Sequence, residues 1–277
     1  MDLIPTGCTA QTLTFGYSPC PNDTFMFHRI ATGALKLPGV SIEVRLHDIE
    51  TLNQLALEER LDISKLSFFA WLKARDAYRL LNSGAALGYG CGPILIAKQA
   101  FDRKDIPNCR VALPGEWTTA HLLFRLWSPE AEHRYFTTYE RIYDEVASGR
   151  ADCGVIIHES RFTYEQCGFQ RLVDLGQWWE EQTGLPIPLG GIAARTALGP
   201  EVLSAVDELL RASIERSRQD PQAALPYIRQ HAQEMDLEVL ERHIAAFVNP
   251  FSLDLGPVGR QALKVLEQRA RDAGVLP

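Results

Sequence analysis

The 277-residue sequence lacks paired cysteines. Its six cysteines include no C-x-x-C pair and lie far apart, at Cys8, Cys20, Cys91, Cys109, Cys153 and Cys167. Structural zinc sites and thiol–disulfide active sites usually contain such pairs, so we expect neither. In a chain long enough to build its own core, scattered cysteines indicate reduced thiols rather than a disulfide framework.

Export and membrane signals are also missing. The first residues, MDLIPTGCTAQTLTFGYS, show no basic region followed by an apolar one, as a secretory signal would. The charge-free stretch between Arg79 and Lys98 contains Asn82, Pro93 and several glycines, which makes it a poor membrane-spanning helix. We therefore expect a cytoplasmic protein that makes no contact with a membrane.

An excess of basic residues is absent as well. The chain has 28 Lys and Arg against 35 Asp and Glu, a net charge of -7. Nucleic-acid-binding domains usually present a basic face, so we do not expect nucleic acid as a partner. Hydrophobic residues make up 46% of the chain, which is ordinary for a globular protein of one large or two medium domains.

Several motifs of well-known enzyme classes are absent. The sequence has no G-x-S-x-G nucleophile elbow and no G-x-x-x-x-G-K-[ST] phosphate loop. Residues 88–92 are rich in glycine, but Pro93 and an apolar run follow them instead of a phosphate-binding helix. His158 and Glu159 do not begin an H-E-x-x-H zinc site, because Phe162 stands where the second histidine is needed.

What the sequence does contain is an alternation of strand and helix patterns, which predicts an α/β fold. The expected strands cover residues 13–17, 40–46, 63–69, 93–97, 110–113, 154–157, 171–175 and 189–194. The expected helices cover residues 24–31, 51–59, 71–81, 120–127 and 139–148, with Asp23 as N-cap of the first and Thr118 or Thr119 as N-cap of the fourth. Beyond Pro200 we expect helices only, over 200–214, 221–231, 237–247 and 258–273.

This order suggests two lobes. We expect residues 98–194 to form one lobe, and residues 1–97 and 195–277 to join into a second, discontinuous lobe. Two crossings of the chain, near residues 97 and 194, would connect them.

Polar side chains follow two of the expected strands in the first lobe. Asn22 and Asp23 lie in the segment 18–25, where ligands of open α/β sheets bind, although a rigid turn with a helix cap is an equal alternative. Lys65 and Ser67 offer a charge and a hydroxyl that can hold a carboxylate. The alternative for Lys65 is a charge that simply faces water.

A third candidate segment begins the expected helix at 120–127. Free backbone amides and hydroxyls at a helix start form a natural site for an anion, which favours Thr119 and Ala120 as ligand contacts. Helix capping explains the two threonines equally well.

His158 is the strongest single candidate. An apolar strand delivers His158 and Glu159 at its carboxyl end, and histidine is the commonest general base near neutral pH. The alternative is a histidine that serves the structure only. A thiol nucleophile at Cys153 is disfavoured, because along an extended strand it lies on the opposite face from His158.

Several longer segments resemble the 1,4-dihydroxy-6-naphthoate synthase family of the futalosine route to menaquinone. They are S-P-C-P-N-D-T-F at 18–25, K-L-S at 65–67, I-I-H-E-S-R-F-T-Y at 156–164, V-D-L-G-Q-W-W-E at 173–180, T-G-L-P-I-P-L-G at 183–190 and N-P-F-S-L-D at 249–254. The resemblance spans almost the whole chain and is weakest over residues 127–138 and the first dozen residues.

The resemblance implies a two-lobed, periplasmic-binding-protein-like fold of type II, here with a helical C-terminal segment. It implies conversion of cyclic dehypoxanthinyl futalosine, a small-molecule carboxylate, into 1,4-dihydroxy-6-naphthoate with release of a three-carbon fragment. His158 would be the proton acceptor, and no metal or organic cofactor is implied. The implied substrate contacts are Lys65, Leu66, Ser67, Thr119 and Ala120, to which we add Asn22 and Asp23 from their place in the chain.

Two other functions stay open. The resemblance extends to chorismate dehydratase of the same pathway, a relative with a similar fold, although the segments 18–25 and 158–164 favour the naphthoate synthase. A protein that binds or senses a small molecule without catalysis is the other alternative, since fold alone does not decide function.

Overall fold

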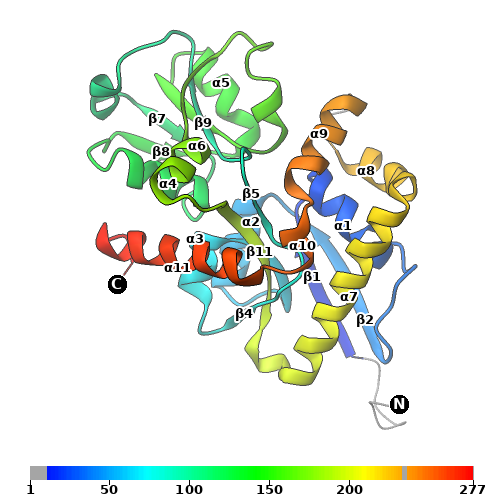
Figure 1. Cartoon of the computed structure of the whole chain (residues 1–277). Coiled ribbons are helices and arrows are strands. Elements are labelled where there is room, and N and C mark those ends of the chain that lie inside the picture. Colours follow the sequence, from blue (N-terminus) through cyan, green and yellow to red (C-terminus); the bar gives the residue numbers. More distant parts are fainter. Residues whose placement is uncertain (1–10, 233–235, 277) are drawn as a thin grey trace.

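The structure is a computed structural model that describes residues 11–232 and 236–276. Cys8 and most of the N-terminal segment that bears on export lie outside these residues. Two β-sheets, each with its own helices, form two lobes that lie side by side (Figure 1). In the described part of the chain, no helix is both long and apolar enough to span a membrane.

The first sheet has the strand order β2-β1-β3-β11-β4, and β5 also pairs with β11. Its strands are β1 (Gln11–Tyr17), β2 (Val40–Leu46), β3 (Ile63–Ser67), β4 (Tyr78–Leu80), β5 (Ala86–Gly88) and β11 (Ile187–Arg195). Strands β1, β2 and β3 run parallel, whereas β11 runs antiparallel to β3, β4 and β5. The parallel strands β1 and β3 therefore end at the same edge, which brings the loop after Tyr17 close to Ser67.

The second sheet has the strand order β10-β6-β9-β7-β8. Its strands are β6 (Ile94–Ala97), β7 (Val111–Leu113), β8 (Arg134–Phe136), β9 (Cys153–Ile156) and β10 (Gln170–Asp174). The sheets do not follow the predicted lobe boundaries. Strand β6 was predicted to belong to the first lobe, but it lies in the second sheet. Strand β11 lies in the first sheet, although all of it except Arg195 was predicted to belong to the second lobe. We propose that the lobes follow the sheets, with crossings over residues 89–93 and 184–186.

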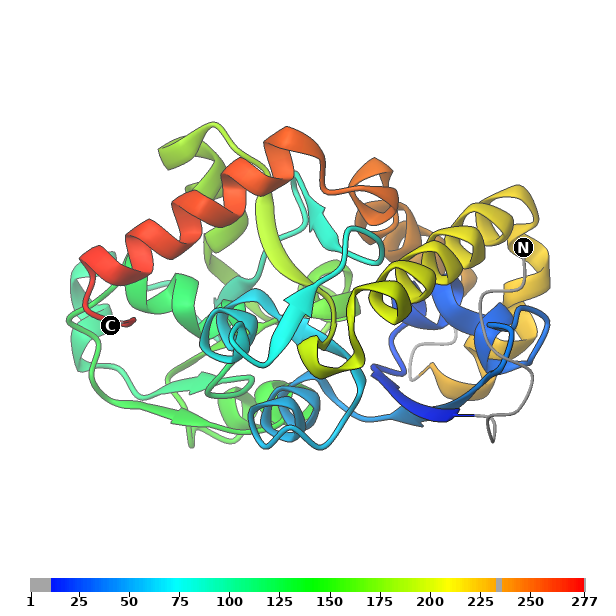
Figure 2. The same cartoon turned by 90° about the horizontal axis from the view of Figure 1, so that it is seen from below.

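Helices cover both sheets and make up most of the chain after β11. They are α1 (Pro21–Ala31), α2 (Ile49–Leu57), α3 (Phe68–Ala74), α4 (Thr119–Trp127), α5 (Ile142–Ala147), α6 (Leu175–Thr183), α7 (Pro200–Gln219), α8 (Leu225–His231), α9 (Leu237–Phe247), α10 (Pro250–Leu253) and α11 (Gly256–Asp272). Helices α7, α8 and α9 pack against α1 in the first lobe, and α11 reaches back to contact α4 of the second lobe (Figure 2).

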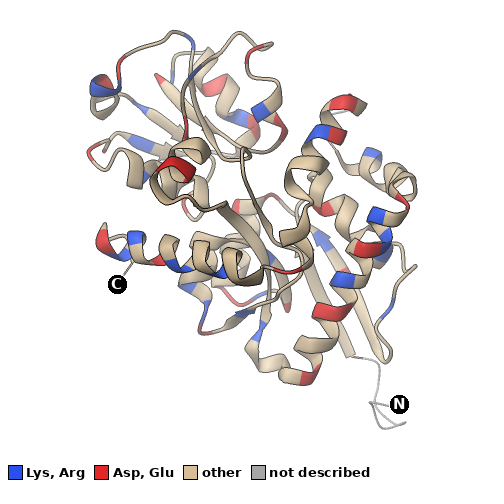
Figure 3. Ribbon diagram, in the orientation of Figure 1, with Lys and Arg blue, Asp and Glu red and all other residues tan. Residues whose placement is uncertain are grey.

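The core consists of apolar faces that the sequence periodicity places inward. One cluster joins Leu13 and Phe15 of β1 to Phe27 of α1 and to the apolar face of α7, including Leu210 and Ile214. On its outer side α7 carries basic and acidic residues in mixed order (Figure 3). This amphipathic pattern is the reason why the long C-terminal helix was predictable.

Two expected helix boundaries are wrong. Asp23 is not the N-cap of α1, because the helix begins at Pro21 with Cys20 as N-cap, and proline suits the first helical position. The expected helix over 71–81 ends at Ala74 within α3, and β4 follows because Tyr78 and Leu80 pair with β11. Tertiary pairing here overrides local helical preference.

Other expectations are confirmed. Thr118 is the N-cap of α4, and its hydroxyl accepts a hydrogen bond from the backbone N–H of His121 at 3.2 Å. Helix α9 has the predicted bounds. Strand β8 and helix α6 had no counterpart in the sequence prediction, since β8 is only three residues long and α6 contains a glycine near its start.

Candidate active site

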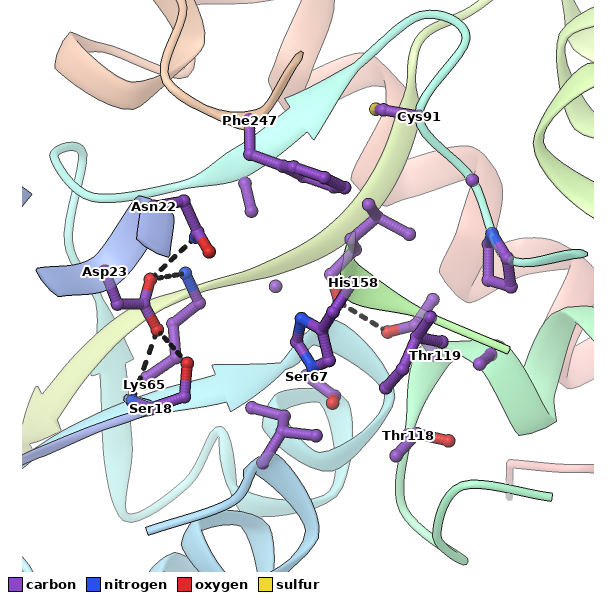
Figure 4. Close-up of a pocket in the computed structure, with 18 residues that line it drawn as sticks. Ser18, Asn22, Asp23, Lys65, Ser67, Cys91, Thr118, Thr119, His158 and Phe247 are labelled. Carbon is purple, nitrogen blue, oxygen red and sulfur yellow. Dashed lines mark hydrogen bonds and ion pairs between the residues drawn. The ribbon is translucent and has the colours of Figure 1, made fainter. Parts of the chain in front are cut away.

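A cavity lies between the two lobes (Figure 4). Ser18, Asn22, Asp23, Lys65 and Ser67 line it from the first lobe. The second lobe contributes Thr118, Thr119, Ala120 and His158. Residues from the ends of strands β1, β3 and β9 thus face one another across the cavity, as the carboxyl-end rule for open sheets predicts.

Asp23 and Lys65 form an ion pair in the cavity wall. The Lys65 Nζ lies 2.8 Å from Asp23 Oδ1, and both side chains are buried. Asp23 Oδ2 also accepts a hydrogen bond from the Ser18 hydroxyl at 2.7 Å. The alternative in which Lys65 faces water is therefore wrong, and the charge of Lys65 is balanced before any substrate arrives.

Asn22 links this ion pair to helix α9. Its amide Nδ2 donates to Asp23 Oδ1 at 2.9 Å, so its carbonyl Oδ1 is left as an acceptor. His243 Nε2 lies 2.9 Å from that Oδ1 and must be the donor, and the His243 side chain is fully buried. A chain of hydrogen bonds therefore runs from α9 through α1 to Lys65.

His158 stands at the start of a 3₁₀ turn directly after β9. Its backbone has a φ of 59°, in the left-handed region that a non-glycine residue rarely adopts. Its Nδ1 lies 3.4 Å from the Sγ of Cys20, and its ring packs edge-on against Tyr139. Backbone strain of this kind is concentrated at functional sites.

The second nitrogen of His158 shapes its chemistry. Nε2 is buried and has no hydrogen-bond partner among residues 11–232 and 236–276. Burial in the protein is the main cause that lowers the pKa of His158 to about 4; the nearby charge of Asp23 has a smaller effect that raises it, whereas the charge of Lys65 also lowers it. The imidazole is therefore neutral at pH 7 and able to accept a proton.

Ser67 and the start of α4 offer hydrogen-bond donors across the cavity. Ser67 Oγ accepts from Asn53 Nδ2 at 3.1 Å, which leaves its hydroxyl proton able to point at a ligand. Thr119 Oγ1 donates to the Leu189 carbonyl at 2.7 Å, so its hydroxyl proton is already used. The first backbone amides of α4, those of Thr119 and Ala120, have no acceptor within the helix and form a natural anion site.

Seven of the eight side chains predicted from the sequence line the cavity, and the exception is Leu66. The Leu66 side chain is buried in an apolar cluster with Ala56 and Tyr78, because alternate residues of β3 point to opposite faces. A contact between Leu66 and a ligand would therefore have to use its backbone. Glu159 is buried rather than in solvent, with Oε2 3.9 Å from His243 Nδ1.

Cys20 and His243, which contact site residues without lining the cavity, are among the residues that sequence reasoning missed. Cys20 lies inside the segment 18–25 that drew attention, but only the fold reveals that it meets His158. His243 carries a weak signal: it falls between Leu240 and Phe247 on the apolar face of α9, where a polar residue needs a partner. Within the described ranges, no group of three or more His, Cys, Asp or Glu side chains is placed to hold a metal ion.

Comparisons with known proteins agree with this architecture. A family model described as menaquinone biosynthesis matches residues 13–272. A relative from Thermus thermophilus, named 1,4-dihydroxy-6-naphtoate synthase, is 45% identical over 265 residues, which is 96% of each chain.

Among solved structures, protein AF1704 from Archaeoglobus fulgidus has a TM-score of 0.90 and 31% identity, covering 96% of this chain and 98% of its own. The alkanesulfonate-binding protein SsuA from Xanthomonas axonopodis pv. citri has a TM-score of 0.72 at 15% identity, covering 98% and 96%. At that identity SsuA shows the fold alone, which confirms the expected periplasmic-binding-protein-like architecture. The family model and the Thermus thermophilus relative match nearly the whole length of the chain, and these two matches show that the chain belongs to the menaquinone biosynthesis family.

Proposed function

We propose that this protein is a 1,4-dihydroxy-6-naphthoate synthase. It would act as a carbon–carbon lyase that converts cyclic dehypoxanthinyl futalosine into 1,4-dihydroxy-6-naphthoate and releases dihydroxyacetone. The name of the Thermus thermophilus relative supports this reaction. The structural observation that carries the proposal is His158, a neutral imidazole with an unpartnered Nε2 in the wall of an interlobe cavity.

His158 acts as the general base. Its Nε2 takes a proton from the substrate, and the electron pair left behind drives cleavage of the carbon–carbon bond that holds the three-carbon fragment. Formation of the aromatic naphthoate supplies driving force. A pKa of about 4 keeps the base unprotonated over the whole neutral range.

Groups from both lobes hold the substrate carboxylate and oxygens. The Ser67 hydroxyl and the backbone amides of Thr119 and Ala120 donate hydrogen bonds, and the start of α4 adds its favourable dipole. Lys65 contributes hydrogens of its ammonium group while Asp23 fixes its position. Asn22 lines the cavity beside Lys65 and contributes its side-chain amide to substrate binding.

Positioning of the substrate must supply most of the rate enhancement. A general base contributes about 10²–10⁴-fold, whereas holding the reactants in the right geometry is worth far more. A cavity between two lobes suits this requirement, because closure around the substrate excludes water and aligns donors from both sides. We infer that the reaction takes place in the cytoplasm, in keeping with cysteines that are all free in the described part of the chain.

The test is a direct assay. Purified protein is incubated with cyclic dehypoxanthinyl futalosine, and naphthoate formation is followed by liquid chromatography and mass spectrometry. The His158→Asn variant should bind the substrate but turn it over at least about 100-fold more slowly. Turnover of that variant within a few-fold of the wild-type rate would remove His158 from the chemistry.

The same assay separates the alternatives. Dehydration of chorismate by the wild-type protein, with no naphthoate formed, would favour a chorismate dehydratase. Tight binding of either compound without any product would favour a binding or sensing protein on the same fold.

A further inference from the structure

We propose that Cys20 is a positioning residue for the base. Its sulfur accepts a hydrogen bond from the Nδ1–H of His158 and thereby keeps the lone pair on Nε2, the atom that takes the substrate proton. This inference rests on the proposed function. It assigns to the cysteine of the S-P-C-P-N-D segment a role in choosing the histidine tautomer.

The backbone holds the Cys20 sulfur in place. Cys20 is the N-cap of α1 between Pro19 and Pro21, and two prolines leave its backbone little freedom. Its carbonyl accepts hydrogen bonds from both the backbone N–H and the hydroxyl of Thr24, each at 3.0 Å. Its Sγ lies 3.4 Å from His158 Nδ1, within hydrogen-bond range for sulfur, and the residue is 3% exposed.

The His158 ring is held equally firmly. It stacks edge-on against Tyr139 with ring centroids 4.9 Å apart, and the His243 ring lies 6.4 Å away on a nearly parallel plane. With the backbone in the left-handed region, the ring is directed so that Nδ1 meets Cys20. Nδ1 therefore has one partner among the described residues, and Nε2 has none.

The direction of this hydrogen bond decides the chemistry. A neutral imidazole carries one proton, and it can act as a base only at the nitrogen that lacks it. If the thiol donated to Nδ1, the proton would sit on Nε2, and no lone pair would be left at that atom to accept a proton from the substrate. If Nδ1–H donates to sulfur, Nε2 keeps its lone pair for the substrate.

The Cys20–His158 contact differs from a nucleophilic cysteine–histidine pair. Burial raises the pKa of the Cys20 thiol well above its usual range, with a further rise from Glu159, and burial lowers the pKa of His158. The pair is therefore a neutral thiol beside a neutral imidazole, not a thiolate beside an imidazolium. Cys20 is also not among the residues that line the cavity, which leaves it no direct path to the substrate.

A tautomer measurement tests this without substrate. In protein labelled with ¹⁵N at histidine, long-range ¹H–¹⁵N spectra report which ring nitrogen carries the proton, and the His158 signals are those lost in His158→Asn. We expect the Nδ1–H tautomer in the wild type and in Cys20→Ser, whose oxygen is also an acceptor. Cys20→Ala should shift the population toward the Nε2–H tautomer.

Kinetics supply the second readout. Cys20→Ala should lower kcat on the order of tenfold, which is only part of the roughly 10²–10⁴-fold that a general base contributes, while KM changes by less than about twofold. Cys20→Ser should restore most of kcat. Cys153→Ala is the matched control, because Cys153 is also fully buried but lies in the core of the second lobe without contact to His158.

The outcomes distinguish this inference from the proposed function. A wild-type protein that forms no naphthoate would overturn the proposed reaction. A wild type that forms naphthoate with His158 in the Nε2–H tautomer, or a folded Cys20→Ala variant with unchanged kcat, would overturn the role of Cys20 alone. If Cys20→Ala fails to fold, the tautomer and kcat of Cys20→Ser decide.

Discussion

At the scale of single residues, the buried ion pair between Asp23 and Lys65 predicts a large effect on stability. Asp23→Asn keeps the shape of the side chain but leaves the buried ammonium of Lys65 without its counter-charge. We expect the free energy of unfolding, measured by urea denaturation, to fall by about 3–5 kcal/mol.

The matched control is Glu43→Gln, which removes one charge of the exposed pair between Glu43 and Arg45. Exposed pairs contribute about 0–1 kcal/mol, so this variant should be nearly as stable as the wild type. Equal losses in the two variants would contradict the structural role of the Asp23–Lys65 pair.

The titration of buried His121 should make the free energy of unfolding depend on pH. Burial lowers its pKa to about 4, against about 6.5 in an unfolded chain. Between these values the unfolded state binds a proton that the folded state does not, so this contribution is complete above pH 6.5 and is lost as the pH falls toward 4.

His121→Asn should reduce the pH slope of the unfolding free energy in that window by up to about 1.4 kcal/mol per pH unit, the value for one proton. The variant keeps a donor near the Glu116 carbonyl that His121 Nδ1 contacts at 2.7 Å. His133, which is exposed, serves as the control for replacing a histidine. An unchanged slope in His121→Asn would show that His121 titrates alike in both states.

At the scale of secondary-structure elements, predictability follows from how local the determining forces are. Helix α9 has its predicted bounds because Asp236 caps it and its apolar face repeats at helical spacing. The segment that became β4 was predicted as helix, since only its pairing with distant β11 makes it a strand. Sheet membership was hidden for the same reason, because the sequence does not show that β6 pairs within the second sheet and β11 within the first.

In the candidate site, too, residues marked by the local sequence were predicted, whereas residues defined by distant contacts were not. His158 was found because a strand ends just before it, Asn22 and Asp23 because they follow a strand, and Lys65 and Ser67 because they are polar residues in a short strand. Cys20 and His243 were missed, because their partners lie 138 and 221 residues away along the chain. The local pattern of one sequence does not name the partner in contacts over such separations, even where, as for His243 on the apolar face of α9, it shows that a partner is needed.

Helix α9 yields its own prediction through His243. Replacing His243 by Phe removes the donor that satisfies Asn22 Oδ1 and loosens the chain of hydrogen bonds to Lys65. We expect a loss of about 1–3 kcal/mol in unfolding free energy and a lower kcat/KM. His243→Gln, which keeps a donor, should recover part of both.

The exposed Glu241 on the same helix provides the control, and Glu241→Gln should match the wild type in stability and activity. A His243→Phe variant as stable and active as Glu241→Gln would show that Asn22 is held by other contacts.

At the scale of the whole molecule, Glu50 joins the two lobes next to Ile49, which lines the cavity. It lies on α2 of the first lobe, and its carboxylate accepts hydrogen bonds from the backbone amides of Glu116 and Trp117, each at 3.0 Å, in the loop before α4. The loop comes this close because Gly115 has a φ of 130°, and a Cβ at that position would lie 2.5 Å from Glu50 Oε2. The contact therefore favours the arrangement of the lobes seen in this structure over a more open one.

Glu50→Ala should shift the free protein toward more open lobes, seen as a larger radius of gyration in small-angle X-ray scattering. Hydrogen bonds to a charged acceptor contribute about 1.5–3 kcal/mol, and substrate binding would then have to supply that energy, so KM should rise by about tenfold or more. Because the catalytic groups themselves are unchanged, kcat at saturation should stay near the wild-type value.

The control is Glu58→Ala, at the exposed end of the same helix. It removes an equal charge without touching the second lobe and should leave both the radius of gyration and KM unchanged. Scattering and KM of Glu50→Ala that match those of Glu58→Ala would mean that packing, rather than the Glu50 contact, holds the lobes together.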